Sequence, residues 1–444
     1  MQKKTNSMTG NSLASQGEYY SPKMTTKSSV MSLDTESTGT SDVAEPIRTA
    51  TVASGFSILT KSMIGSGLFV MAFACSKFGI IAATFMLVVA ALVTWVSLRT
   101  LSVLAIEFKD SQPSFYSISE QIIPSMKWVI DFSVILNCLG ASTGYVITAG
   151  DFLSSSLMGI FDWNPDSLSV DSAKIIIQVG MVLILSPLCF MKQLSGTKVA
   201  NFVGLACLLY IVVTTFVYSD LANAGSELLY MNSFLSAMGA FPTFIFAFSC
   251  QMNVFEIANE LRNPTVKRMN VISIASTMTG LLIYVPIMIL PYLTFGSGIQ
   301  NNYLSNLDPK LVPVQTAYLL AGLSVSISYV LQVHPLRRSI LSIYYGSRIP
   351  KHKEEIRNRG IVVLLILMAT FGIAVGLKKI DVVTNFTGLL GGNTMSFLMP
   401  SLLYLKHYGI MKDPFGIAVL AVLVFSVILY PLCLTGIIYD MMNA

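Results

Sequence analysis

Long stretches without Asp, Glu, Lys or Arg alternate along this chain with short charged segments. The uncharged stretches cover residues 78–98, 132–150, 175–191, 199–219, 228–255, 269–307, 311–336, 360–377, 382–405 and 414–439. A helix needs about 20 apolar residues to cross the hydrocarbon core of a bilayer, and most of these stretches meet or approach that length. The region 49–76 is also long enough but carries one internal charge, Lys61. The pattern predicts an all-α membrane protein with eleven transmembrane helices.

Composition agrees with this interpretation. The chain is 53% hydrophobic and only 11% charged, whereas roughly a quarter of the residues in soluble domains are charged. A membrane β-barrel would show alternating segments of about 10 residues, and none of the uncharged stretches alternates. The solvent of most of this chain is therefore expected to be lipid.

The basic residues indicate how the chain is oriented. If each span crosses once, most of the 28 Lys and Arg residues lie on the side of the N-terminus, seven of them between residues 337 and 359. The opposite face holds Lys77, Lys174, Lys310, Lys378 and Lys379. The positive-inside rule then predicts a cytoplasmic N-terminus, and the net charge of +5 is a signal of topology.

Residues 1–46 differ from the rest because they are polar and rich in Ser and Thr, without an early apolar segment of the kind found in signal peptides. Such a composition buries too little surface to offset the entropy of ordering, which predicts a disordered cytoplasmic tail. A regulatory phosphorylation segment and an inert solvated tail both fit this composition.

Several function classes lack their signatures. The six cysteines and three histidines are scattered, with no CxxC spacing, and no GxxxxGK[ST] phosphate loop is present. The sequence has no paired histidines and no nucleophile with a nearby base, which would suggest an enzyme. It also has no repeated filter motif, which would suggest a channel. No cofactor, metal or nucleic-acid partner is expected; the oligomeric state stays open.

The most informative features are interruptions of the helical pattern. The first span contains Ile64-Gly65-Ser66-Gly67, and the sixth contains Gly239, Phe241-Pro242 and Ser249-Cys250-Gln251. Gly and Pro weaken helices, and backbone groups freed inside a bilayer need other partners. Breaks at matching positions in two halves indicate a secondary transporter with inverted repeats.

The repeats would cover residues 49–219 and 234–405, with an extra helix at 414–439. Helix N-termini at the breaks would attract a carboxylate, and exposed carbonyls would accept from an ammonium group, so an α-amino acid suits the site. The alternative is that these small residues only allow close helix packing.

The residues around both breaks resemble the amino acid/auxin permease family, and the second block is similar to fungal vacuolar amino acid transporters. The blocks are Met63-Ile64-Gly65-Ser66-Gly67-Leu68-Phe69 with Phe73-Ala74 and Phe78-Gly79, then Phe246 to Phe255 with Asn259-Glu260-Leu261 and Pro264, and more weakly Tyr292 to Gly296 and Pro335 to Ser339. The resemblance extends over residues 47–440. It implies a LeuT/APC-like five-plus-five inverted repeat plus one helix, and amino acid transport coupled to protons or, in some branches, sodium. A vacuolar or lysosome-like membrane is favoured over the plasma membrane.

One residue departs from the family pattern. Many relatives carry Asn four residues before the first-helix glycine, where it helps to bind sodium, and this chain carries Lys61. A lysine there resembles the proton-assisted branch, since a fixed ammonium replaces the cation electrostatically. The alternative is that Lys61 reaches back to the cytoplasmic interface. Ser324, Ser326 and Ser328 of the eighth span lie where the family fold places hydroxyls near the cation; Ser324 and Ser328 share a helical face and Ser326 points elsewhere.

The expected substrate-binding residues come from both breaks and from the third span, which also carries Asn137, Ser142 and Thr143. They are Ile64, Gly65, Ser66, Gly67, Tyr145, Phe246, Phe248, Ser249, Cys250 and Gln251. Tyr145 either closes over the substrate or packs in the core, and the same choice holds for Phe246 and Phe248. Glu256, Glu260, Asp131 and Asp151 are candidate proton carriers, and the sequence does not choose among them. An amino acid sensor on a transporter scaffold is the main alternative function.

Overall fold

The computed structural model describes residues 48–443 except 49, 110–112, 161–169, 192–197, 221–227, 229, 232, 347, 349–350, 378–379 and 411–413. The polar tail expected at residues 1–46 lies outside the described residues, and so do Lys378 and Lys379.

The described residues form helices and no strand, apart from one isolated β-bridge between Ala50 and Leu261. The α-helices are α1 (Val52–Met63), α2 (Gly67–Phe78), α3 (Ile80–Glu107), α4 (Phe115–Ile122), α5 (Lys127–Ile160), α6 (Val170–Phe190), α7 (Lys198–Val217), α8 (Phe234–Ala247), α9 (Asn253–Glu260), α10 (Val266–Phe295), α11 (Val312–Tyr345), α12 (His352–Leu377), α13 (Ile380–Phe386), α14 (Met399–Tyr408) and α15 (Pro414–Asn443). The all-helical prediction is confirmed for this part of the chain.

Seven of the described helices are long and apolar enough to cross a membrane alone: α3, α5, α6, α10, α11, α12 and α15. The pair α1 and α2 passes the same test as one span bent by 51°, which makes eight. The predicted stretches 199–219 and 228–255 fall largely on the shorter helices α7 and α8, and 382–405 falls on α13, α14 and the segment between them. The chain is therefore a multi-pass helical membrane protein, while the count of eleven and the inverted repeat stay predictions.

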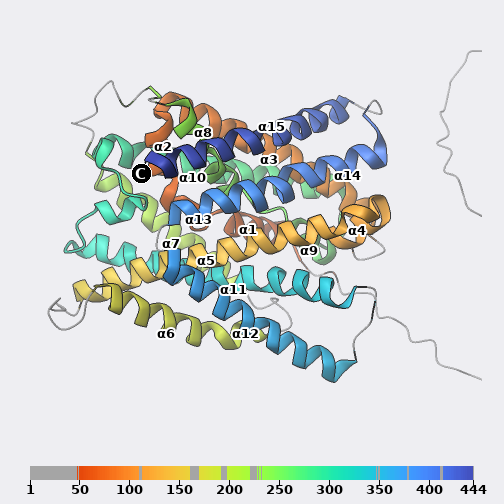
Figure 1. Ribbon diagram of the computed structural model, residues 1–444, viewed down its shortest axis with the longest axis horizontal. Coiled ribbons are helices and arrows are strands. Elements are labelled where there is room, and N and C mark those ends of the chain that lie inside the picture. The colour runs from red at the N-terminus through yellow and green to blue at the C-terminus, as the bar shows by residue number, and fades with distance from the viewer. Residues whose placement is uncertain are drawn as a thin grey trace, which may run out of the picture. The chain divides into compact units, whose positions relative to one another are not determined.

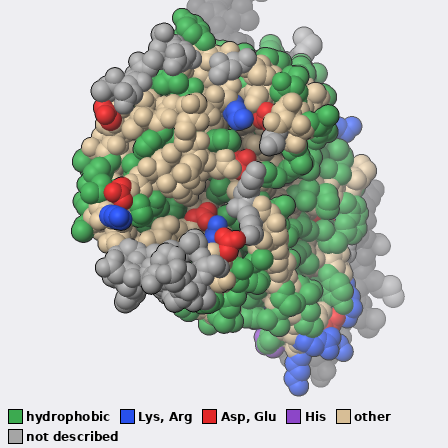
Figure 2. All heavy atoms as spheres, turned by 60° about the vertical axis from the view of Figure 1, so that its left-hand side comes forward, with side chains coloured by type: hydrophobic (Ala, Val, Ile, Leu, Met, Phe, Trp, Pro, Cys, Tyr) green, Lys and Arg blue, Asp and Glu red, His purple; other side chains and the backbone are tan. Residues whose placement is uncertain are grey.

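The helices divide into an inner and an outer set. In α5 and α11, 72% and 61% of an apolar 18-residue segment of the helix is buried. In α6, α12 and α15 the buried share of the corresponding segment is only 28%. Figure 1 shows α5 and α11 side by side in the middle of the bundle with α6 and α12 below them, and the α5–α11 pair makes the most extensive helix contact. Hydrophobic side chains cover much of the face shown in Figure 2, as expected for helices whose outer surface meets lipid.

The segment between α13 and α14 has a form that the sequence did not predict. It continues as two π-helical segments, η6 (Thr387–Gly392) and η7 (Thr394–Leu398). Glycines let η6 approach its neighbours closely, because a Cβ atom at Gly391 would lie 2.6 Å from the Asn137 nitrogen of α5 and one at Gly388 would collide with the Pro242 carbonyl of α8. π-Helical turns are frequent at functional sites. Here they bring η7 next to the interruption that follows α8.

We predict that Gly391→Leu lowers the melting temperature of the detergent-solubilised protein, because its side chain overlaps the α5 backbone. Overpacking of this kind costs about 1–3 kcal/mol or more. Gly372→Leu in α12 is the control, since a Cβ there meets nothing within 4 Å. A thiol-reactive dye follows unfolding, because five of the six cysteines are buried. Equal melting temperatures for the two variants would contradict the packing argument.

Candidate functional site

The first interruption lies between α1 and α2. Thr51 caps the start of α1, because its hydroxyl accepts from the Ser54 N–H at 3.2 Å. The helix ends before Ile64, whose backbone is extended with φ −88° and ψ 91°. The helix resumes with short i+3 bonds from the Leu68 and Phe69 N–H groups to the carbonyls of Gly65 and Ser66, both 3.2 Å long. The prediction of a break at residues 64–67 is confirmed.

The two glycines of this break lie against different neighbours. A Cβ atom at Gly65 would collide with the Tyr145 hydroxyl of α5, and one at Gly67 would lie 3.1 Å from the Ala247 Cα at the end of α8. Gly67 therefore permits close helix packing, whereas Gly65 leaves room for a polar side-chain group. Both glycines thus allow close contacts between helices, and substrate binding at this break stays a prediction.

The second interruption lies between α8 and α9 and covers Phe248 to Met252. The Ser249 N–H donates to the Phe246 carbonyl at 3.1 Å, and the Cys250 N–H donates to the side-chain oxygen of Gln251 at 2.9 Å. The expectation that Gly239 and Pro242 also interrupt this span is wrong, because α8 runs through both. Gly239 instead packs on α15, where its Cβ would lie 2.7 Å from the Gly436 backbone.

One side chain joins the two breaks. The hydroxyl of Tyr284, from α10, lies 2.7 Å from the Met63 carbonyl and 2.8 Å from the Ala247 carbonyl, which belong to the last residues of α1 and α8. Tyr284 is fully buried, and the ring of Phe248 packs edge-on against it at 5.2 Å. Sequence reasoning missed this residue. The available signal was a tyrosine in an apolar stretch, since a buried Tyr hydroxyl usually needs a partner, but Tyr292 and Tyr303 in the same stretch share that signal.

Lys61 lies just before the first break with its side chain turned inward. Its ammonium donates to Ser328 Oγ at 2.8 Å and to Ser324 Oγ at 3.1 Å, and the residue is 1% exposed. The end of the side chain therefore lies on α11 inside the bundle. Ser326 does not join this group, because its hydroxyl donates to the Gly322 carbonyl of its own helix at 2.7 Å.

A glycine of α7 makes room for this lysine. A Cβ atom at Gly204 would lie 2.5 Å from Lys61 Cε, so a larger residue there has to push the lysine stem aside. The sequence carried no sign of this contact, because Gly204 lies in an ordinary apolar stretch far from Lys61. Within the described part of the chain, no carboxylate forms an ion pair with Lys61.

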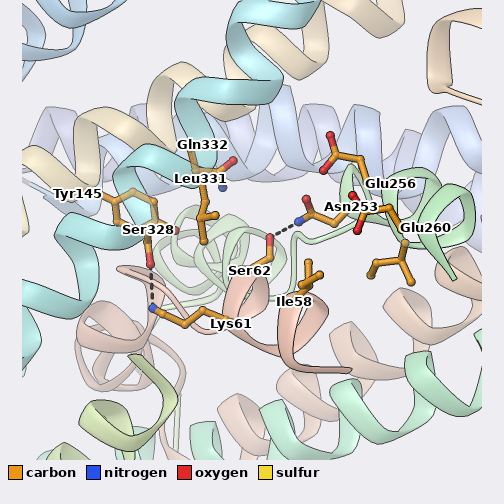
Figure 3. A pocket seen from close by; sticks show the side chains of 11 residues that line it. Ile58, Lys61, Ser62, Tyr145, Asn253, Glu256, Glu260, Ser328, Leu331 and Gln332 are labelled. Carbon is orange, nitrogen blue, oxygen red and sulfur yellow. Dashed lines mark hydrogen bonds between the residues drawn. The ribbon is translucent and has the colours of Figure 1, made fainter. Parts of the chain in front are cut away.

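A small cavity of about 60 Å³ opens beside Lys61 (Figure 3). Its lining residues are Ile58, Lys61, Ser62, Tyr145, Asn253, Glu256, Ile257, Glu260, Ser328, Leu331 and Gln332. The Asn253 amide donates to Ser62 Oγ at 2.5 Å and so ties α9 to α1. Cavities that hold whole ligands are typically about 300 Å³ or larger, so this cavity is too small for such a ligand unless the helices around it move.

The candidate proton carriers lie in different surroundings. Glu256 is paired with Arg338 and Asp151 with Lys174, while the Ser342 hydroxyl donates to Asp131 at 3.4 Å. Glu256 and Glu260 both line the cavity that contains Lys61. The geometry brings the two glutamates near the site and leaves Asp131 outside that cavity.

The pattern of the family described as transmembrane amino acid transporter protein matches residues 48–443. The chain belongs to this family. It is 26% identical over 349 residues to vacuolar amino acid transporter 5 of Schizosaccharomyces pombe, an alignment that covers 78% of this chain and 82% of the relative. It is 24% identical to vacuolar amino acid transporter 5 of Saccharomyces cerevisiae, with 81% and 89% covered, and 24% identical to amino acid transporter AVT6E of Arabidopsis thaliana, with 78% and 74% covered.

Membership in the transmembrane amino acid transporter family confirms the resemblance found around the two breaks. It also agrees with a protein that works as a transporter and not as an enzyme. The matched region includes the residues of both interruptions and Lys61 with its partners Ser324 and Ser328.

We predict that Tyr284→Phe reduces amino acid uptake by proteoliposomes at least about tenfold, because it removes the donor shared by the last carbonyls of α1 and α8. An unsatisfied buried acceptor costs about 1–3 kcal/mol. Tyr303→Phe is the matched control: its buried hydroxyl pairs with the Thr215 side chain at 3.0 Å and contacts no carbonyl of either break. If both variants lose uptake equally, Tyr284 has only a structural role.

Proposed function

We propose that this protein is a secondary active transporter that moves amino acids across a membrane by alternating access, coupled to protons and independent of sodium. The observation that carries the proposal is the pair of interrupted helices whose carbonyl ends converge on one buried phenol. In the proposed fold, residues 47–440 form eleven spans in a five-plus-five inverted repeat with one extra helix.

The two breaks supply the charges that a zwitterion needs. The N-terminus of α2 at Gly67 places the positive end of a helix dipole beside a carboxylate at Gly65. The carbonyl ends of α1 and α8 at Met63 and Ala247 carry the opposite partial charge and accept from the α-ammonium. Tyr145 covers Gly65 from α5 and closes over the substrate in this arrangement.

The Lys61 ammonium takes the place of a bound cation. Its contacts with Ser324 and Ser328 satisfy hydroxyls that would otherwise coordinate sodium, and a fixed charge there makes a sodium ion unfavourable by repulsion. The proton then remains as the coupling ion, and Glu256 and Glu260 in the adjacent cavity are its candidate carriers.

The relatives named vacuolar support an acidic organelle, vacuolar or lysosome-like, as the location. The basic residues support a cytoplasmic N-terminus. With that orientation the cavity beside Lys61 opens on the cytoplasmic half of the bundle, where α1 begins and α9 and α11 end.

Gly65→Leu should abolish uptake of radiolabelled amino acids while leaving the amount of membrane-inserted protein unchanged, because the new side chain occupies the space between Gly65 and Tyr145. Gly180→Leu in α6 is the control, since a Cβ there meets nothing within 4 Å. Normal uptake by the Gly65 variant would exclude this break as the site. Saturable binding by the wild type without net flux would identify a sensor in place of a transporter.

Replacing sodium with choline on both sides of the proteoliposome membrane should leave the initial uptake rate unchanged within about twofold, because Lys61 already fills the cation position.

Collapsing an imposed pH gradient with a protonophore should abolish accumulation of the amino acid against its own concentration gradient. A rate that falls with sodium removal and survives the protonophore would overturn the coupling proposed here.

A further inference from the structure

The core around the two breaks contains side-chain polar atoms without partners. Nine buried side-chain nitrogen and oxygen atoms lack a hydrogen-bond partner among the described residues, and three belong to this region: Ser66 Oγ in the first break, Gln251 Nε2 in the second and Ser142 Oγ on α5. Gln251 is fully buried. Since buried polar groups are nearly always paired in folded proteins, an unpaired amide at a helix break needs a partner that the described residues do not supply.

The chemistry of the neighbours determines which way the Gln251 amide points. One of its terminal atoms lies 2.9 Å from the Cys250 backbone nitrogen and 2.7 Å from Ser396 Oγ. A backbone N–H only donates, so the atom that faces it must be the oxygen, Oε1. The NH₂ group therefore points away from both, and its two donors have no acceptor in the described structure.

Ser396 holds this arrangement from the π-helical segment η7. Its hydroxyl has one proton, which it donates to Gln251 Oε1, and its own carbonyl accepts from Ser97 on α3. Ser249 Oγ lies 3.1 Å from Ser396 Oγ and therefore donates to it. Asn137 Oδ1, 3.5 Å from Ser249 Oγ, is then left able to accept another hydrogen bond.

The result is a cluster with a spare donor on Gln251 and a spare acceptor on Asn137, built from neutral groups. Asn137, Ser249, Gln251 and Ser396 are each at most 5% exposed, and no Lys, Arg, Asp or Glu takes part in these hydrogen bonds. A carboxamide offers one acceptor and one donor side by side and carries no charge. A carboxylate would enter this cluster without a cation to compensate its desolvation.

We propose that Gln251, positioned by Ser396, is the specificity residue for the substrate side chain and selects neutral amino acids with a carboxamide. The Gln251 NH₂ donates to the carboxamide oxygen, and Asn137 Oδ1 accepts from its NH₂. This inference rests on the proposed transport function, in which the breaks hold the α-carboxylate and α-ammonium and the side chain extends toward α5 and η7.

Uptake of glutamine, methionine and glutamate by proteoliposomes tests the assignment, because the three side chains have nearly the same length. Wild-type protein should favour glutamine over the other two by at least about tenfold in kcat/KM, since a site built for hydrogen bonds rejects analogues that leave it unpaired. Gln251→Met should erase this preference, because it replaces the amide donor with a thioether of similar length.

Two further variants separate positioning from folding. Ser396→Ala should raise the KM for glutamine several-fold more than the KM for methionine, because the amide is no longer held. Gln178→Met is the matched control: Gln178 is also a buried glutamine, but its Nε2 already donates to the Val146 carbonyl at 3.3 Å. This control should keep the wild-type preference for glutamine.

A wild type that moves glutamine and methionine equally well would overturn the proposal, and so would equal loss of all substrates in Ser396→Ala. If the wild type transports no amino acid at all, the proposed transport function fails. In that case, ligand-induced shifts in melting temperature test the side-chain site without transport. The site is supported if glutamine raises the melting temperature of the wild type and not that of Gln251→Met, and it is excluded by any other result.

Discussion

The arrangement of this protein depends on one constraint: main-chain groups released inside a bilayer must find partners within the protein. Two helices stop in the middle of the bundle, and their last carbonyls, of Met63 and Ala247, reach the same hydroxyl on Tyr284. A phenol has one proton, so it serves two acceptors at once and leaves each partly unsatisfied. The same pair of carbonyls can therefore hold the breaks together and still attract a cationic group.

The side chains around the breaks form two groups, one charged and one neutral. Lys61 places a positive charge against Ser324 and Ser328, next to a small cavity that also contains two glutamates. On the other side, Ser396 orients Gln251 within a neutral cluster. In the proposed function the first group serves ion coupling and the second contacts the substrate side chain.

Glycines explain how the helices come close enough for these contacts. Gly65 leaves space for the Tyr145 hydroxyl, Gly204 for the lysine stem, and Gly391 for the α5 backbone. Each removes a Cβ atom at a contact where one would collide, and the polar groups then reach across helices at hydrogen-bonding distance. In a membrane, where helix association relies on close packing and polar contacts, such positions have a large effect on geometry.

The sequence by itself determined the helical class, the membrane environment, the two interruptions and the family, because hydropathy and the weakness of Gly and Pro in helices act over a few neighbouring residues. It also placed Lys61 in the first span and Ser324 and Ser328 on one face. It wrongly extended the second interruption to Gly239 and Pro242, since a helix in a packed bundle tolerates both. Only the tertiary structure decided that Tyr284 joins the breaks, that Gly204 accommodates Lys61 and that Ser396 orients Gln251. Those contacts join residues far apart along the chain, and their existence depends on how the helices pack.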